Sequence, residues 1–171
     1  MDPDELGELI DRQIDYFAAN PDEGRGADTP ATAAPGRGRR VHVDGPNGWA
    51  ITTDQPEAAG GSGSAPNPGW FWRAALASCD VTVLMGRAAH VGIDLTDVEV
   101  AVESESDVRG TLGIDDDVPA GPGLVRVAFT LSASNADAAR LRELVEWTES
   151  HSPVGDAIGR PVPVEREVTI E

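Results

Sequence analysis

The chain of 171 residues contains 30 acidic residues and 13 cationic ones, all arginine, so its formal net charge is −17. This length suits one domain with a hydrophobic core and room for a short appendage. A strongly negative surface repels phosphate, so the composition disfavours nucleic acid as a partner. Two causes fit the charge, a halophilic source and a GC-rich genome. We favour the first, because genome bias explains missing lysine better than excess acid.

Residues 1–19 are expected to form an amphipathic helix. Asp2 and Glu5 fit a capping box, and Pro3 fits the first helical position. The apolar residues that follow fall on one face at helical spacing: Leu6, Leu9, Ile10, Ile14 and Phe17. This acidic start lacks the order of charges of a signal peptide. We expect a cytoplasmic protein without a membrane association.

Residues 20–36 are rich in Pro, Gly, Ala and Thr and are expected to be a flexible linker. The remainder, 37–171, mixes helical and alternating patterns and is predicted to be one α+β domain. Its expected elements are a hairpin (39–43 and 49–53), a long helix (70–90), two strands (98–103 and 125–131), a helix capped by Asn135, a short helix (153–159) and a last strand (162–170).

The long apolar helix carries Cys79, the only cysteine of the chain, so no intramolecular disulfide can form. Its segment also contains Arg73, Asp80 and Arg87, which exclude a membrane span. Two interpretations of Cys79 are open. It is either a small buried hydrophobic residue or a reactive thiolate, and a thiolate needs a cation or hydrogen-bond donor nearby. A carboxylate at Asp80 would oppose the thiolate if it lay close and unpaired.

Other groups of polar residues give weaker evidence for a functional site. His42, His90 and His151 lack metal-ligand spacing with Cys79, so we expect no metal and no cofactor. His151 beside Ser152 lacks the nucleophile elbow of a hydrolase. Ser152 followed by Pro153 is typical of a helix N-cap and first helical residue.

Three segments together resemble the active-site region of the OsmC/Ohr family of thiol-dependent hydroperoxide reductases. They are Pro66-Asn67-Pro68, then Ala75-Leu76-Ala77-Ser78-Cys79, and finally Ser152-Pro153-Val154. The resemblance spans residues 37–171. It implies an OsmC-like fold, in which antiparallel sheets wrap around central helices in an intertwined homodimer.

The resemblance also implies roles for individual residues. Cys79 would be the cysteine that attacks the peroxide, and Arg39 or Arg37, with Arg40 as a further candidate, would stabilise its thiolate. Ser152 stands where the family has its resolving cysteine, and Gly69 stands where it has a glutamate. A one-cysteine enzyme of this kind would need an external thiol reductant and an organic hydroperoxide. Its pocket would be lined by Pro68, Trp70, Phe71 and Trp72, which otherwise belong to the core.

The two departures from the family pattern keep a second function open. Without the resolving cysteine and the glutamate, the chain would be a non-enzymatic OsmC-fold dimer that binds a small apolar ligand or has a structural role. Cys79 would then serve packing alone. If the chain is an enzyme, Cys79→Ser should abolish turnover and Ser152→Ala should not.

Overall fold

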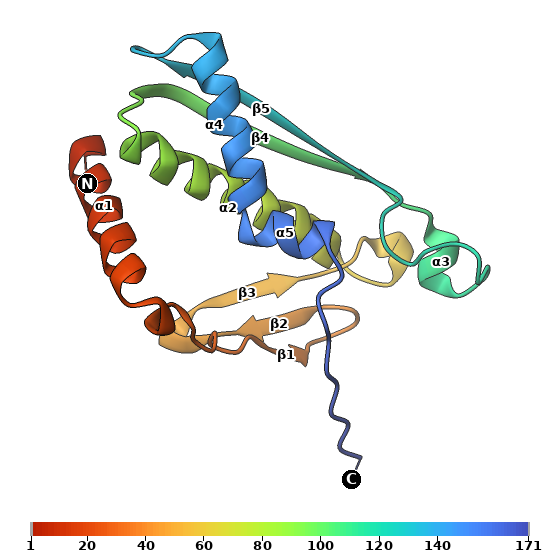
Figure 1. Cartoon of the computed structure of the whole chain (residues 1–171). Helices are drawn as coiled ribbons and strands as arrows, with labels where there is room; N and C mark the ends of the chain where they lie inside the picture. The colour runs from red at the N-terminus through yellow and green to blue at the C-terminus, as the bar shows by residue number, and fades with distance from the viewer. Residues whose placement is uncertain (1, 171) are drawn as a thin grey trace. The chain divides into compact units, whose positions relative to one another are not determined.

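A computed structural model describes residues 2–170, which form two compact units. The larger unit contains residues up to 10 and from 76 onward, and the smaller unit contains 11–75. The mixture of helices and antiparallel strands confirms the predicted α+β class (Figure 1). In chain order, the helices are α1 (Pro3–Ala19), α2 (Pro68–His90), α3 (Val108–Leu112), α4 (Ala138–His151) and α5 (Pro153–Gly159). The strands are β1 (Thr32–Pro35), β2 (Val41–Asp44), β3 (Ala50–Thr53), β4 (Leu95–Glu105) and β5 (Leu124–Ala133).

The smaller unit is built around an antiparallel sheet in the order β1-β2-β3. The predicted hairpin is confirmed as β2 and β3, with Val41 opposite Thr53. Asn47 lies between them at a φ of 60°, a left-handed conformation that asparagine adopts more readily than most other residues. The expected linker needs a correction, because its last part forms β1, in which Thr32 pairs with Asp44 of β2.

The loop from β3 to α2 is organised by the carboxylate of Asp54, which is 1% exposed. It accepts hydrogen bonds from the hydroxyl groups and backbone amides of Ser62 and Ser64, and from the amide of Gln55. These bonds hold the pKa of Asp54 well below its usual range, the Ser62 hydroxyl contributing most. The backbone of Gly61 passes so close that a Cβ atom there would lie 1.9 Å from the Gln55 carbonyl oxygen. The loop is therefore a fixed entry to α2, although it is rich in Gly, Ser and Pro.

The larger unit contains a two-stranded ribbon of β4 and β5, in which Val100 faces Phe129 and Val102 faces Val127. Helices α2 and α4 lie on one side of this ribbon (Figure 1). The core between them is formed by Leu84, Ala88, Ile93 and Leu144, with Val98, Phe129 and Leu131 packed against it. This packing fixes α4, and so its C-terminal end, against the middle of α2.

The predicted N-terminal helix is confirmed as α1. Asp2 Oδ1 accepts from the Glu5 amide at 3.2 Å, and Glu5 Oε2 accepts from the Asp2 amide at 3.3 Å, which is the expected capping box. Gly7 lies against the end of α2, where a Cβ atom would be 2.9 Å from the Ala89 carbonyl oxygen. Glycine therefore allows the first turns of α1 to approach α2 closely.

Two predictions about the C-terminal half were wrong. Asp137 caps α4 through a 2.9 Å bond from the Arg140 amide, whereas Asn135 bonds to the Asp94 amide and the Gly92 carbonyl group. The predicted last strand does not form, because no strand lies within residues 161–170. Its alternating apolar residues are exposed: Val162, Val164, Val168 and Ile170.

Candidate active site around Cys79

The structure brings Cys79 and Ser152 together, although 73 positions separate them in the sequence. Ser152 Oγ donates a hydrogen bond to Cys79 Sγ at 3.4 Å. Ser152 is 1% exposed, whereas Cys79 on α2 is half-buried. The same Oγ accepts from the Gly155 amide at 3.2 Å, so the predicted N-cap of α5 is confirmed. Ser152 therefore serves both as a cap and as a hydrogen-bond donor to the only thiol.

Asp80 follows Cys79 on α2 and is only 4% exposed. Burial raises the pKa of its carboxyl group, and a hydrogen bond with Ser152 opposes this effect by a smaller amount. Its Oδ1 atom has no hydrogen-bond partner among residues 2–170. The bond to Ser152 is therefore made by the other carboxyl oxygen. Cys79, Asp80 and Ser152 form one polar cluster.

Aromatic contacts hold the C-terminal end of α4, which Ser152 follows directly. The rings of Trp147 and His151 stack with centroids 3.9 Å apart, and the guanidinium carbon of Arg87 lies 4.6 Å from the Trp147 ring. Nδ1 of His151 is 2.7 Å from the Trp147 carbonyl oxygen. These contacts connect α4 to α2 and leave His151 directed at its own helix rather than at Ser152.

The remaining predicted site residues lie in the smaller unit, around the start of α2. Asn67 caps this helix, because its Oδ1 accepts from the Trp70 amide at 2.9 Å. The rings of Trp70 and Phe71 meet edge to face at 5.3 Å. Trp70 is 49% exposed and Pro68 is also exposed, whereas Phe71 and Trp72 are half-buried.

The three candidate arginines differ in their surroundings. Arg37 and Arg39 are exposed, and Arg39 Nη1 donates to the Ala59 carbonyl oxygen at 3.0 Å. Arg40 is half-buried, and its buried Nε atom has no partner within residues 2–170. The sequence offered no signal that separates Arg40 from its neighbours, because three arginines lie within four positions.

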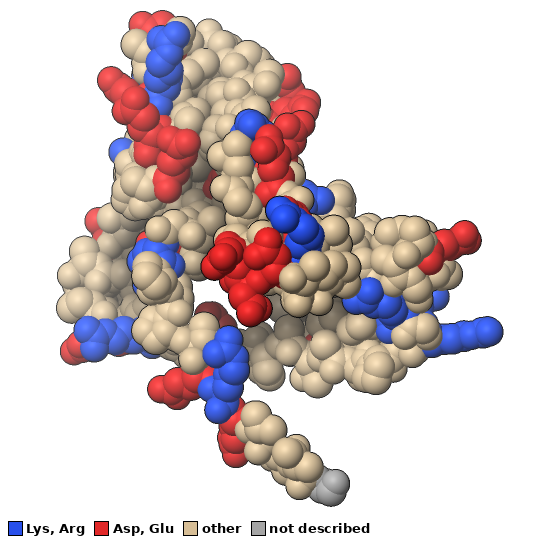
Figure 2. Space-filling model, turned by 90° about the vertical axis from the view of Figure 1, so that its right-hand side faces the viewer, with Lys and Arg blue, Asp and Glu red and all other residues tan. Residues whose placement is uncertain are grey.

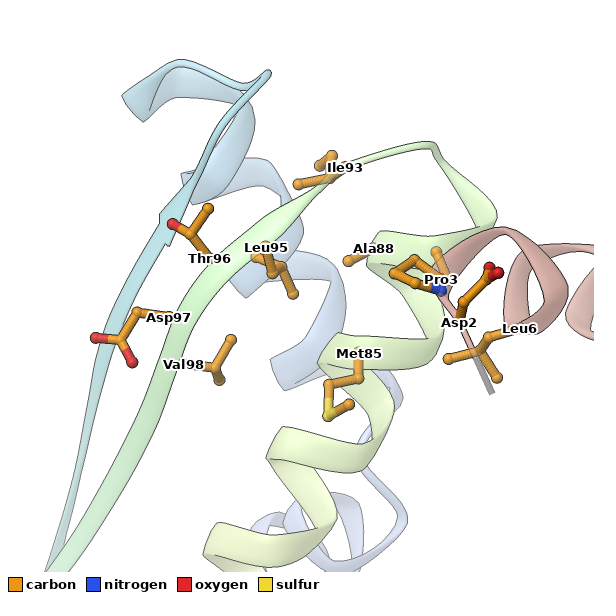
Figure 3. Close-up of a pocket in the computed structure, with 11 residues that line it drawn as sticks. Asp2, Pro3, Leu6, Met85, Ala88, Ile93, Leu95, Thr96, Asp97 and Val98 are labelled. Carbon is orange, nitrogen blue, oxygen red and sulfur yellow. The ribbon is translucent and has the colours of Figure 1, made fainter.

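A separate apolar cavity of about 360 Å³ lies within the larger unit, and the sequence did not indicate it. Pro3 and Leu6 of α1, Met85 and Ala88 of α2, and Leu95 and Val98 of β4 point toward it (Figure 3). Its size is at the lower end of the range for small-molecule pockets.

Acidic side chains are exposed in several groups on the face shown in Figure 2, and arginines lie beside some of them. Within residues 2–170, no cluster of three or more potential metal ligands occurs. The same residues contain no helix long and apolar enough to cross a membrane.

The family model described as OsmC-like protein matches residues 61–167. The fold is similar to that of an OsmC-like protein from Mycoplasma pneumoniae, with a TM-score of 0.67 and 14% identity over 79% of this chain and 89% of that one. An organic hydroperoxide resistance protein, OsmC, from Legionella pneumophila has a TM-score of 0.58 and 24% identity over 78% of this chain and 90% of that one. An organic hydroperoxide resistance protein from Elizabethkingia anophelis has a TM-score of 0.58 and 20% identity over 78% of this chain and 89% of that one.

At these identities, the solved structures show a shared fold. The comparison with curated proteins gave no match. The family model covers well over half of the sequence and includes both Cys79 and Ser152. The chain belongs to the OsmC-like protein family.

Proposed function

We propose that the protein reduces organic hydroperoxides with Cys79 as its single redox-active residue and an external thiol as reductant. The observation that carries this proposal is the contact between the half-buried Cys79 sulfur and the Ser152 hydroxyl group. A donor beside the sulfur favours the thiolate, the form that attacks peroxides. The family membership supports the same role, as do the Legionella and Elizabethkingia proteins, which are named organic hydroperoxide resistance proteins.

The reaction would begin when the Cys79 thiolate attacks the terminal oxygen of R–O–OH. The sulfur–oxygen bond forms as the O–O bond breaks, and the departing alkoxide takes a proton from water to become the alcohol ROH. Cys79 is oxidised to a sulfenic acid. An external thiol then attacks the sulfenic sulfur, forms a mixed disulfide and releases water. A second thiol frees Cys79 and leaves as the other half of an external disulfide.

Arg40 is our preferred candidate for the cation that supports the thiolate, ahead of the sequence-based choices Arg39 and Arg37. It is the only one of the three that is half-buried, and its Nε has no hydrogen-bond partner in the described part of the chain. An unsatisfied buried donor is costly unless a further acceptor meets it. In this proposal the acceptor is the Cys79 thiolate. Pro68, Trp70, Phe71 and Trp72 are proposed to contact the apolar part of the hydroperoxide.

A homodimer is part of this proposal. Five hydrophobic side chains are buried within residues 2–170: Leu76, Leu84, Ala88, Ile93 and Leu144. The apolar side of the β4–β5 ribbon continues past this core through Val100, Val102, Val125 and Val127, none of which is buried. A second copy would cover this surface, as expected for obligate dimers, whose interfaces resemble a divided core.

Turnover of cumene hydroperoxide with dihydrolipoamide tests the proposal, with hydrogen peroxide as a second substrate. We expect the wild type to reduce the organic peroxide, Cys79→Ser to be inactive and Ser150→Ala, a change on the exposed side of α4, to remain active. Mass spectrometry should find a sulfenic acid on Cys79. A wild-type protein whose thiol reacts only after unfolding would contradict the proposal.

A second function, binding of a small uncharged apolar ligand, is favoured by the cavity between α1, α2 and β4. Uncharged N-phenyl-1-naphthylamine is a suitable probe, since its fluorescence rises in apolar surroundings. Met85→Trp should fill the cavity and remove dye binding. Thr82→Trp is the matched control, because Thr82 is exposed on α2 and does not line the cavity. Equal binding by both variants would contradict a role for this cavity.

A further inference from the structure

The polar cluster beside Cys79 contains one group that the reaction above does not use. Asp80 is 4% exposed, has an unpartnered Oδ1 and shares Ser152 with the thiol. A buried carboxylate with a bare oxygen and a thiolate nearby would place two negative charges in one apolar region, which is strongly unfavourable. Burial raises the pKa of Asp80, and the hydrogen bond with Ser152 lowers it by a smaller amount.

The valence of the Ser152 hydroxyl group decides how the three residues can be connected. A serine hydroxyl group donates one hydrogen bond and accepts up to two. Its oxygen already accepts from the Gly155 amide. If Asp80 were ionised, it would compete with Cys79 for the single serine proton. A neutral Asp80 instead donates to Ser152 Oγ, so that the serine proton is left for Cys79 Sγ.

We propose that Asp80 acts as an uncharged carboxylic acid that holds the Ser152 hydroxyl group with its proton directed at Cys79 Sγ. Asp80 is thus a positioning residue for the thiol, and Ser152 is a functional donor in its own right. The chain of bonds runs from Asp80 to Ser152 to Cys79. Oδ1 of Asp80 is then the carbonyl oxygen of a neutral acid. Burying a neutral carbonyl oxygen without a partner costs far less free energy than burying a charged carboxylate oxygen. This inference deepens the proposed function and rests on the same thiol.

Two titratable groups that lie near Ser152 in the sequence, His151 and Asp156, are engaged elsewhere. The His151 ring stacks on Trp147, with Nδ1 against the Trp147 carbonyl oxygen. Asp156 accepts from Arg160 Nε at 2.6 Å and is exposed. Neither group therefore replaces Asp80 as the partner of Ser152.

The test is the rate of iodoacetamide alkylation of Cys79 in the folded full-length protein, measured across pH by mass spectrometry. Ser152→Ala should move the midpoint of the profile upward by about one pH unit, because the thiolate loses its donor. Asp80→Asn should leave the midpoint nearly unchanged, since the amide NH2 group can donate to Ser152 Oγ as the neutral acid does. Asp80→Ala should move the midpoint upward, because Ser152 is no longer oriented.

Asp156→Asn is the matched control, as it removes a carboxylate from α5 without touching Ser152, and it should leave the profile in place. A clear downward shift in Asp80→Asn would show that Asp80 is an anion and would overturn the inference. An unchanged midpoint in Ser152→Ala would also overturn it. Because alkylation needs no turnover, an inactive protein with these shifts would contradict the peroxidase proposal alone.

If the Asp80 variants fail to fold, infrared spectroscopy of the wild type and of Ser152→Ala tests whether Asp80 is protonated. A protonated carboxylic acid has a carbonyl stretch distinct from that of a carboxylate. The band of Asp80 should be present in the wild type at neutral pH and should shift in Ser152→Ala, when its hydrogen-bond acceptor is removed. A wild-type spectrum without such a band would overturn the inference.

Discussion

Ser152 Oγ lies 3.4 Å from Cys79 Sγ, so the first residue of the Ser-Pro-Val segment touches the only thiol of the chain. A disulfide needs two sulfur atoms about 2.05 Å apart and Cβ atoms within about 4.5 Å. We expect a thiol in place of the Ser152 hydroxyl group to come close enough to Cys79 to meet this requirement.

We predict that Ser152→Cys forms an intramolecular disulfide with Cys79 under mild oxidation. The expected result is the loss of both free thiols and a mass lower by two hydrogen atoms, reversed by dithiothreitol. Ser150→Cys, two positions away on the exposed side of α4, is the control and should keep two titratable thiols. Retention of both thiols in oxidised Ser152→Cys would show that the contact is longer in solution.

The sequence allowed prediction of the long periodic elements because their patterns repeat many times. The apolar helix α2 extends over 23 residues, and apolar and polar residues alternate within both β4 and β5. The cap of α4 could not be chosen, since Asn135 and Asp137 both suit that position. The choice depends on Asp94 and Gly92, which bind Asn135 from a distant part of the chain.

The site was predictable to a smaller degree. The pairing of Cys79 with Ser152 came only from the family resemblance, because the packing of α4 on α2 is not encoded in a local pattern. Asp80 was expected to oppose the thiolate only if it lay close and unpaired. The burial that raises the pKa of its carboxyl group is a property of the packed structure.

The close approach of α1 to α2 leads to a prediction about two helical glycines. Gly7→Ala places a Cβ atom 2.9 Å from the Ala89 carbonyl oxygen, so it should destabilise the fold by about 1–3 kcal/mol. Gly86→Ala is the matched control, because its Cβ atom meets only Ile10 Cδ1 at 3.8 Å. This variant should gain roughly 0.5–1 kcal/mol from helix propensity. Urea unfolding followed by circular dichroism measures both, and equal stabilisation would disprove the contact.

The exposed C-terminal segment leads to a prediction about assembly. Val164 and Val168 are 65% and 78% exposed, on a segment whose alternation is typical of a strand that lacks a pairing partner. If this segment adds to a sheet in a homodimer, Val164→Asp with Val168→Asp should weaken the dimer at least tenfold. Glu165→Gln, on the alternate side, should leave it intact. Sedimentation velocity across a concentration series measures the difference, and equal dimer stability would show that the segment is not at the interface.

The serine-bound Asp54 leads to a prediction about acid and the loop that enters α2. The hydrogen bonds from Ser62 and Ser64 lower the pKa of Asp54 well below its usual range. A carboxyl group of this kind contributes its full stabilisation above the pKa of the unfolded chain, near 4. The contribution is lost as the pH falls through the lower folded-state pKa. The loop should therefore stay protected at mildly acidic pH and open only in strong acid.

Asp54→Asn removes the charge and presents an NH2 group to the serine donors, so the loop should lose protection at neutral pH. Hydrogen exchange of residues 55–67, read by mass spectrometry, should be at least tenfold faster in this variant at pH 7. The dependence on acid should also flatten, because no carboxylate remains to be protonated. Asp28→Asn, at an exposed position of the same unit, is the control and should exchange like the wild type. Unchanged exchange in Asp54→Asn would mean that the glycine-rich backbone alone fixes the loop.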